Sequence, residues 1–279
     1  MFPQNLHTHT VFGDGKHTPE EMALGAVELG CASLGFSEHS HMPPEADPDG
    51  WTMGAGREAE YRREILRLRE ACRDRLEIFL GLELDADSPV PAEPYDYIIG
   101  SAHGVWKDGC YLSSDASPES FVQGVREHFG GDYYAFAAAC FQREASFAVE
   151  SGCQIVGHFD LVCKFNEGGR LFDESDPRYV RAALEALETA MSRDVIFEIN
   201  TGGISRGWRT SPYPAPFLLK VIREKGGRIC ISSDSHQRDT IVWAFPQAAA
   251  LAESCGFREA WVLDRGGFRP VGLDAYREQ

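Results

Sequence analysis

The sequence predicts a single α/β domain built as a closed or nearly closed parallel barrel. Short apolar runs with strand character alternate with helical patterns along the chain, which is typical of a parallel sheet with connecting helices. The length of 279 residues lies in the usual range of one α/β barrel, and 43% hydrophobic residues can fill a large core. The alternative is an open doubly wound sheet, which would bring fewer strand ends together.

Seven apolar segments are expected to form the strands. In chain order they are the segment ending at Leu6 and residues 32–37, 78–84, 95–101, 154–157, 195–199 and 228–232. A further short run at 260–263 completes the predicted fold.

Helices are expected between these strands. The clearest start has Thr18 as the cap, Pro19 at the first helical position and Glu21 three residues after the cap. The expected helices cover 19–30, 57–75, a segment that begins after Ser117, 132–151, 177–193, 215–225 and 240–255. The glycine-rich segment 200–207 lacks the ending of a P-loop, and no helix is expected to open directly from it.

The composition argues against several function classes. Asp and Glu number 43 against 27 Lys and Arg, so the net charge of −16 argues against a general surface for nucleic acid or anionic membranes. The eight cysteines include no Cys-x-x-Cys pair, which indicates neither a disulfide framework nor a zinc ribbon. The N-terminus has no basic segment, and the longest apolar stretch, 133–141, is too short to span a bilayer. We expect a cytoplasmic protein without a nucleic-acid or membrane partner, and the pattern favours no particular oligomeric state.

Histidine and carboxylate side chains gather at the ends of the predicted strands. His7 and His9 lie in an extended segment, where side chains two residues apart point the same way. Six more such residues follow short apolar runs: His39, Glu83, His103, His158, Asp234 and His236. The C-terminal strand ends of a parallel barrel share one face, so all eight are expected to converge. Because imidazole and carboxylate ligands suit zinc, manganese and iron(II), the pattern predicts a metal site.

These residues lie in a series of motifs that resembles the polymerase and histidinol phosphatase (PHP) superfamily, most closely its histidinol-phosphate phosphatase branch. The resemblance covers nearly the whole chain. Its motifs are His7-Thr8-His9-Thr10 with Asp14-Gly15, Ser37-Glu38-His39, Gly81-Leu82-Glu83, Ser101-Ala102-His103, Gly157-His158-Phe159-Asp160, Glu198-Ile199-Asn200-Thr201 and Ser233-Asp234-Ser235-His236. The resemblance implies a distorted (β/α)7 barrel with its active site at the C-terminal ends of the strands.

The resemblance also implies two or three divalent metal ions, of zinc, iron or manganese, on the same face. One would be held by His7, His9, Glu83 and Asp234. A second would be held by Glu83, His103 and His158, so that Glu83 bridges the two. A third would use His17, His39 and His236.

Two basic residues are candidates for binding phosphate. Lys164 and Arg206 each lie in a loop just past a strand end, where a fixed cation beside a metal site suits an anion. The resemblance also points to a basic residue near each position. The leaving alkoxide needs a proton donor, and the candidates are His41, Asp160 and a metal-bound water.

The predicted activity is hydrolysis of a small phosphate monoester, in which a hydroxide bridging two metals attacks phosphorus. The resemblance implies L-histidinol phosphate as the substrate, in histidine biosynthesis. Other PHP activities stay open: a sugar or nucleotide monophosphatase, a phosphotyrosine phosphatase or a 3′–5′ exonuclease. A non-catalytic metal-binding module is disfavoured because every expected ligand position is filled.

Overall fold

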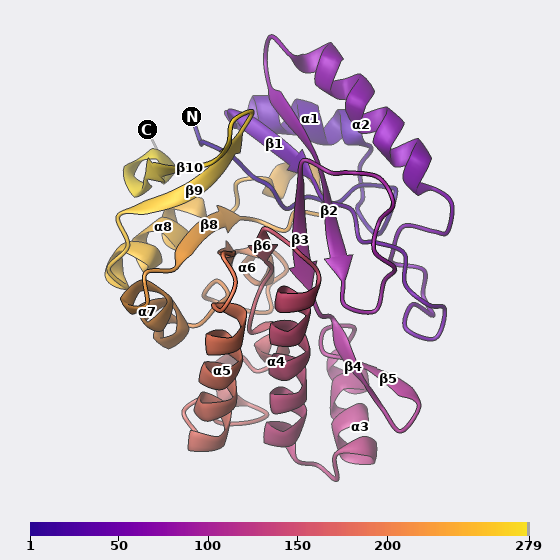
Figure 1. The fold of residues 1–279 in the computed structure, drawn as a ribbon, viewed down its shortest axis with the longest axis vertical. Coiled ribbons are helices and arrows are strands. Elements are labelled where there is room, and N and C mark those ends of the chain that lie inside the picture. The colour runs from indigo at the N-terminus through magenta and orange to yellow at the C-terminus, as the bar shows by residue number, and fades with distance from the viewer. Residues whose placement is uncertain (278–279) are drawn as a thin grey trace.

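The computed structural model describes residues 1–277 and has a curled parallel sheet at its centre (Figure 1). The sheet has six strands in the order β1-β2-β3-β6-β7-β8, and every neighbouring pair is parallel. Their bounds are β1 Ser33–Phe36, β2 Glu77–Asp85, β3 Tyr97–Ser101, β6 Ile155–Val156, β7 Ile196–Asn200 and β8 Arg228–Ser232. These strands confirm six of the predicted apolar runs, with small shifts at their ends.

The N-terminal segment joins the two edges of this sheet. Asn5 pairs with Leu34 on β1, and Thr8 pairs with Ser235 just after β8. The His9 N–H donates to Ser235 O at 2.9 Å on the same side. The sequence predicts a strand here, but the segment forms isolated bridges because it changes neighbour within a few residues. The resulting distorted (β/α)7 barrel confirms the predicted fold class.

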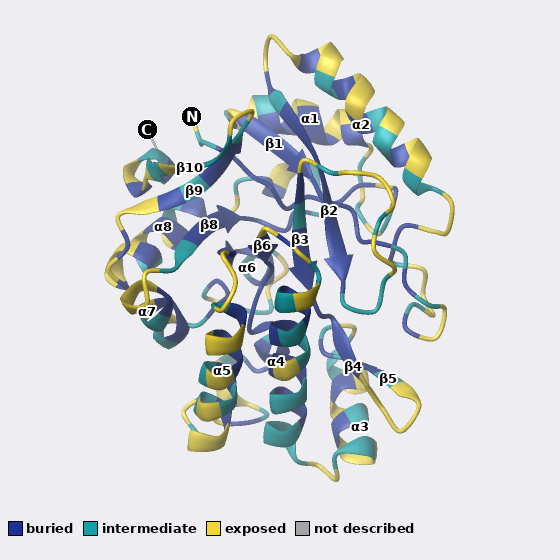
Figure 2. Cartoon of the chain, viewed as in Figure 1, coloured by how far each residue is buried: buried dark blue, intermediate teal, exposed yellow. Residues whose placement is uncertain are grey.

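Helices surround the barrel, and their outer faces are exposed whereas the strands are buried (Figure 2). Their bounds are α1 Pro19–Glu28, α2 Glu58–Cys72, α3 Pro118–His128, α4 Tyr133–Glu150, α5 Pro177–Ala190, α6 Gly202–Ser205, α7 Pro216–Glu224 and α8 Phe245–Ser254. Short 3-10 turns lie at Leu161–Cys163, Glu167–Gly169, Arg238–Thr240 and Leu273–Tyr276. The predicted cap of α1 is confirmed, because Thr18 Oγ1 accepts the Glu21 N–H and Glu21 Oε2 accepts the Thr18 N–H.

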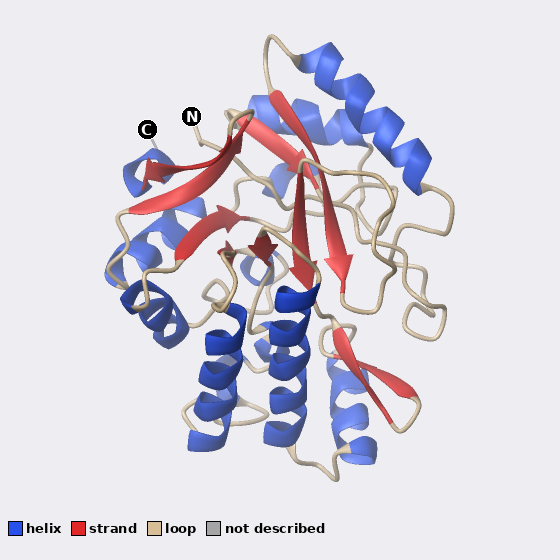
Figure 3. Cartoon of the chain, viewed as in Figure 1, coloured by secondary structure: helices blue, strands red, loops and turns tan. Residues whose placement is uncertain are grey.

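Several local predictions are wrong. Two antiparallel hairpins were not predicted as such, β4 Gly104–Lys107 with β5 Cys110–Ser113 and β9 Glu259–Asp264 with β10 Gly267–Gly272 (Figure 3). A short helix, α6, does open in the glycine-rich segment after β7. The last helix begins at Phe245 because Ala244, with a left-handed φ of 55°, separates it from the preceding 3-10 turn. Among the described residues, no helix is long and apolar enough to cross a membrane.

The barrel interior has an apolar floor and a polar mouth. The floor takes side chains from the N-terminal segment, the strands and the β9 hairpin: Leu6, Phe79, Tyr97, Ile99, Ile155, Ile196, Cys230 and Leu263. Side chains two residues apart on a strand share a face, so Glu83 follows Phe79 towards the mouth and Glu198 follows Ile196. The same strands therefore supply both the core and the polar groups above it.

Tyr97 links the floor to the N-terminal segment. Its hydroxyl donates to Leu6 O, and Phe36 O lies 3.2 Å away. Its ring fills the space beside Gly81, which has no side chain to obstruct it.

We predict that Gly81→Ala lowers the free energy of unfolding by about 1–3 kcal/mol, because overpacking a closed core has that cost. A Cβ at this position would lie 2.1 Å from Tyr97 Cζ. Denaturant unfolding measures the effect. Gly54→Ala is the matched control, since its Cβ would meet Arg57 Cδ at an ordinary 3.8 Å. Equal stability of the two variants would contradict the packing described for Tyr97.

Candidate metal centre

The carboxylate of Glu83 lies at the centre of the barrel mouth. It projects from near the end of β2 and is buried. Its Oε2 lies 3.2 Å from His7 Nε2, 3.5 Å from His9 Nε2 and 2.8 Å from His39 Nδ1. One carboxylate oxygen therefore faces three imidazoles that come from the N-terminal segment and the end of β1.

The other oxygen of Glu83 faces a second pair of imidazoles. Its Oε1 lies 3.0 Å from His158 Nε2 and 3.5 Å from His103 Nε2. These histidines follow β6 and β3. Glu83 thus lies between two sets of nitrogen donors, the position that a bridging ligand requires.

Asp234 completes the first set. Its Oδ1 lies 3.3 Å from His9 Nε2 and 3.8 Å from His7 Nε2. Asp234 has a positive φ of 49°, an uncommon conformation for a residue with a side chain. Such strain is typical of functional positions, where the surrounding structure holds the residue in place.

A third set of donors lies on the outer side of His9. Asp14 Oδ1 is 3.1 Å from His236 Nε2 and 3.7 Å from His39 Nε2. The donor atoms of His9, Asp14, His39 and His236 all lie within 4.8 Å of one another. The family resemblance implies His17 for this set, but the structure does not bring His17 into it. Instead, His17 Nδ1 accepts the Arg238 N–H at 3.3 Å.

Two further carboxylates orient the histidines from behind. Glu198 Oε1 accepts from His7 Nδ1 at 2.6 Å, and Asp85 Oδ2 accepts from His103 Nδ1 at 2.8 Å. Each contact leaves Nε2 of the ring free to face Glu83. A carboxylate behind a histidine fixes its tautomer and raises its basicity as a metal ligand. Neither role was predicted from the sequence, although Glu198 and Asp85 both follow the strand alternation that points into the mouth.

The charged groups of the cluster shift one another's pKa values. Burial opposes charge on Glu83, but His7, His39 and His103 hold the pKa of this carboxyl well below its ordinary value. Burial also opposes charge on His7, yet the surrounding carboxylates, Glu198 first, raise the pKa of its imidazole well above the ordinary value. Glu83 is therefore ionised, as a metal ligand must be.

His9 differs from its neighbours. Burial, together with His39 and His236, lowers the pKa of the His9 imidazole well below its ordinary value. Its ring stacks on that of His39, with the centroids 4.0 Å apart. The neutral His9 ring therefore offers a free lone pair.

Several buried polar atoms of the cluster have no hydrogen-bond partner among the described residues: His7 Nε2, both ring nitrogens of His9 and Glu83 Oε2. Buried polar groups in folded proteins nearly always have partners, so this concentration requires an explanation. Divalent ions that accept nitrogen and oxygen ligands would satisfy His7 Nε2, Glu83 Oε2 and the unprotonated nitrogen of His9. The residues present therefore fit the metal site that the sequence predicts.

The two predicted phosphate ligands have different surroundings. Arg206 Nη2 lies 2.6 Å from Asp234 Oδ2, and Arg206 Nη1 lies 3.0 Å from His236 Nδ1. Arg206 is thus beside the cluster. Lys164 Nζ contacts Asp115 through its carbonyl oxygen at 2.8 Å and its carboxylate at 3.3 Å, so that much of its charge is already balanced.

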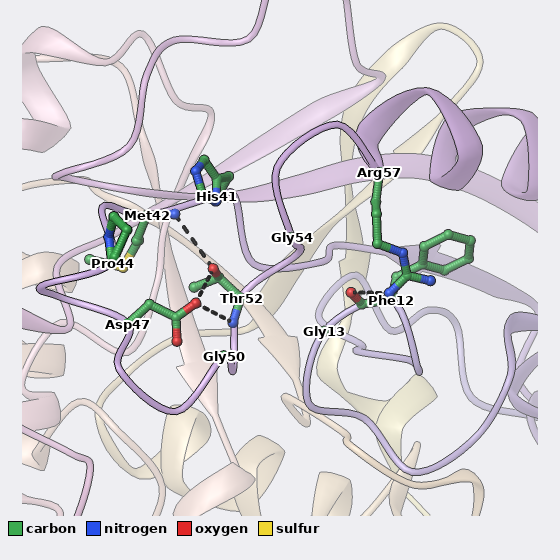
Figure 4. Close-up of a pocket in the computed structure, with 10 residues that line it drawn as sticks. All are labelled: Phe12, Gly13, His41, Met42, Pro44, Asp47, Gly50, Thr52, Gly54 and Arg57. Atoms are coloured by element: carbon green, nitrogen blue, oxygen red, sulfur yellow. Dashed lines mark hydrogen bonds between the residues drawn. The ribbon is translucent and has the colours of Figure 1, made fainter.

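The two predicted proton donors lie outside the four groups of candidate ligands that the described residues form. His41 lines a cavity of about 320 Å³ together with Asp47, Thr52 and Arg57 (Figure 4). Asp160 is fully buried and its Oδ2 accepts the Ala215 N–H at 2.8 Å. Burial raises the pKa of Asp160 to about 7.

We predict that Glu198→Gln weakens zinc binding by roughly 10–100-fold, because the His7 ring loses the charge that orients it. Equilibrium dialysis against a zinc indicator measures this change, with circular dichroism as the check on folding. Glu188→Gln on α5 is the matched control, since Glu188 is exposed and pairs with Lys225 at 3.0 Å. Unchanged affinity in Glu198→Gln would show that the contact is not used.

The third set predicts a difference between two nearby residues. We expect Asp14→Ala to remove or weaken the binding of one metal ion, because Asp14 joins two imidazoles of that set. His17→Ala should keep the metal content of the parent protein. Metal analysis after gel filtration measures both, and the reverse pattern would restore His17 as the ligand.

Comparison with known proteins agrees with this geometry. Residues 5–202 match the PHP domain family. The chain is 31% identical to a Deinococcus radiodurans protein named "Probable histidinol-phosphatase", over 90% of this chain and 93% of that one. It is 26% identical to the histidinol-phosphatase of Bacillus subtilis, over 91% of this chain and all of the other.

A solved structure shares the fold. The histidinol phosphate phosphatase of Lactococcus lactis, complexed with zinc, L-histidinol and phosphate, superimposes with a TM-score of 0.70 at 20% identity. The match covers 96% of this chain and 98% of the other. This protein belongs to the PHP domain family.

Proposed function

We propose that this protein is a metal-dependent phosphatase that hydrolyses L-histidinol phosphate to L-histidinol and inorganic phosphate. The observation that carries the proposal is the Glu83-centred cluster, whose two carboxylate oxygens face separate sets of imidazoles. The relatives named as histidinol-phosphatases support the choice of substrate.

The chain offers ligands for two or three divalent ions of zinc, iron or manganese. His7, His9, Glu83 and Asp234 would hold the first, Glu83, His103 and His158 the second, and Asp14, His39 and His236 the third. Bound divalent ions lower the pKa of water and neutralise phosphoryl oxygens, which is the chemistry that phosphate ester hydrolysis needs. The zinc in the Lactococcus lactis structure supports this choice of ions.

Arg206 is proposed to bind the phosphoryl group of the substrate. Its guanidinium is anchored by Asp234, and the side chain remains 29% exposed. A guanidinium has five N–H donors, so donors remain for phosphate oxygens after the contact with Asp234. Lys164 is the weaker of the two phosphate candidates because it contacts Asp115, which lies outside the candidate ligand groups, whereas Arg206 contacts Asp234 and His236 within them.

His41 is the preferred donor of the proton that the leaving alkoxide takes up. Its ring is partly exposed and lies two residues beyond His39 on the same loop. Asp160 carries a proton below about pH 7, but its carboxyl is enclosed and bonded to the backbone of Ala215. A proton donor must reach the leaving oxygen, which favours the more accessible group.

We also propose that the protein works in the cytoplasm on a small phosphorylated substrate, without a nucleic-acid or membrane partner. The net charge of −16 and the free state of all eight cysteines support this assignment.

The test is release of inorganic phosphate by zinc- or manganese-loaded protein. We expect a kcat/KM of about 10⁴ M⁻¹s⁻¹ or above for L-histidinol phosphate. The value should clearly exceed those for sugar, nucleotide and aryl phosphates and for single-stranded DNA. A flat profile would retain a phosphoesterase but overturn the proposed substrate.

Removing a ligand should abolish turnover and leave the fold largely intact. We predict that His9→Ala and Asp234→Asn each retain less than about 5% of the parent kcat/KM, since a lost transition-state interaction of 2 kcal/mol or more reduces the rate at least about thirtyfold. His128→Ala is the matched control, because His128 ends α3 and belongs to none of the four candidate ligand groups of the described residues. Substantial activity in either ligand variant would refute its assignment.

A further inference from the structure

The indole ring of Trp51 lies over the edge of the metal centre. Its centroid is 4.7 Å from that of His39 and 5.2 Å from that of His103, with interplanar angles of 82° and 64°. These two histidines contact different oxygens of Glu83, His39 the Oε2 and His103 the Oε1, and their own ring centroids lie 5.2 Å apart. Trp51 therefore borders two of the ligand sets at once, although it comes from a loop between β1 and α2.

The position of Trp51 is fixed by a dedicated turn. Asp47 Oδ1 accepts the Trp51 N–H at 2.7 Å, and Asp47 Oδ2 accepts the Thr52 N–H at 3.2 Å and the Thr52 hydroxyl at 2.6 Å. Figure 4 shows the contacts between Asp47 and Thr52. On the following residue, the Met53 N–H donates to His39 O at 3.1 Å. The backbone on both sides of Trp51 is thus held to fixed points.

The cavity of about 320 Å³ lies against the same loop. Its lining includes Asp47 and Thr52 but does not include Trp51. The loop therefore does not rest on a solid core at this point. Its shape depends on the Asp47 turn, which directs Trp51 towards the metal centre instead of into the cavity.

The side chain of Trp51 is only partly buried. A fully packed core tryptophan would be enclosed, whereas Trp51 is of intermediate burial although its ring contacts two histidines of the metal centre. Tryptophan attracts other aromatic rings, and its face attracts cations. A neutral imidazole ring can pack against the indole as an aromatic partner. A protonated imidazole can also bind the indole face as a cation.

We infer that Trp51 is a specificity-determining residue that forms an aromatic wall for the planar heteroaromatic group of the substrate. This inference rests on the proposed function, in which the phosphate binds at the cluster. L-Histidinol phosphate joins its phosphate to its imidazole through a short carbon chain, so the ring must lie close to the residues that border the cluster. Trp51 borders it on the side of His39 and His103.

The test compares binding and discrimination in Trp51→Ala, Trp51→Phe and the parent protein, each loaded with zinc. L-Histidinol binding is measured by calorimetry, and kcat/KM is measured with L-histidinol phosphate and with glycerol 2-phosphate. Trp51→Ala should weaken L-histidinol binding about tenfold and lower the ratio of the two kcat/KM values by a similar factor. Trp51→Phe should retain most of both, because it keeps an aromatic face.

Trp106→Ala is the matched control, since Trp106 is an exposed tryptophan on β4 that contacts Tyr111. It should leave L-histidinol binding and the ratio unchanged. The intrinsic fluorescence of the parent should also change on addition of L-histidinol, and Trp51→Phe should lose that change.

The outcomes separate the two proposals. If the parent protein shows no preference for L-histidinol phosphate over glycerol 2-phosphate, the proposed function fails. If the parent protein prefers L-histidinol phosphate and Trp51→Ala keeps that preference, Trp51 does not form an aromatic wall for the substrate and the inference fails. Loss of bound zinc in Trp51→Ala, with equal loss of activity on both substrates, would show that Trp51 only packs the histidines and would also overturn the inference.

Discussion

The buried carboxylate of Glu83 is the interaction on which the site depends. A lone carboxylate in such a place would be costly, and burial alone would favour its protonated form. The imidazoles around Glu83 reverse that preference and lower its pKa. Because its two oxygens face different histidines, the ionised group also sets the spacing between the donor sets. The ionised carboxylate of Glu83 thus determines both the charge balance and the spacing of the ligands at the barrel mouth.

The barrel makes this arrangement possible by separating apolar and polar functions along each strand. On β2, Phe79 packs in the floor, Gly81 leaves room for Tyr97, and Glu83 reaches the mouth. The N-terminal segment adds His7 and His9 and also joins the edges of the sheet. Residues that close the barrel are therefore covalently adjacent to ligands, which couples the stability of the fold to the site.

Most of this could be predicted from the sequence, for a physical reason. Strand ends of a parallel barrel share one face, so ligands after apolar runs could be brought together without knowing the loops. The paths of the loops could not be predicted in this way. The structure places Asp14, and not His17, beside His236. The roles of Glu198 and Asp85 depend on which ring nitrogen each contacts, a property of three-dimensional geometry. The β4–β5 hairpin did have a local signal in Asp108-Gly109, where both residues have positive φ.

The measurement that tests the central claim most directly is the unfolding temperature of chelator-stripped protein as zinc is added back. If the orphaned donors around Glu83 hold divalent ions, zinc binds the folded state preferentially and stabilises it by about 2.7 kcal/mol at a hundredfold excess over its Kd. For a chain of this size, that stabilisation raises the unfolding temperature by about 5 °C. An unfolding temperature that does not change with zinc would contradict the account of Glu83 as a bridging metal ligand.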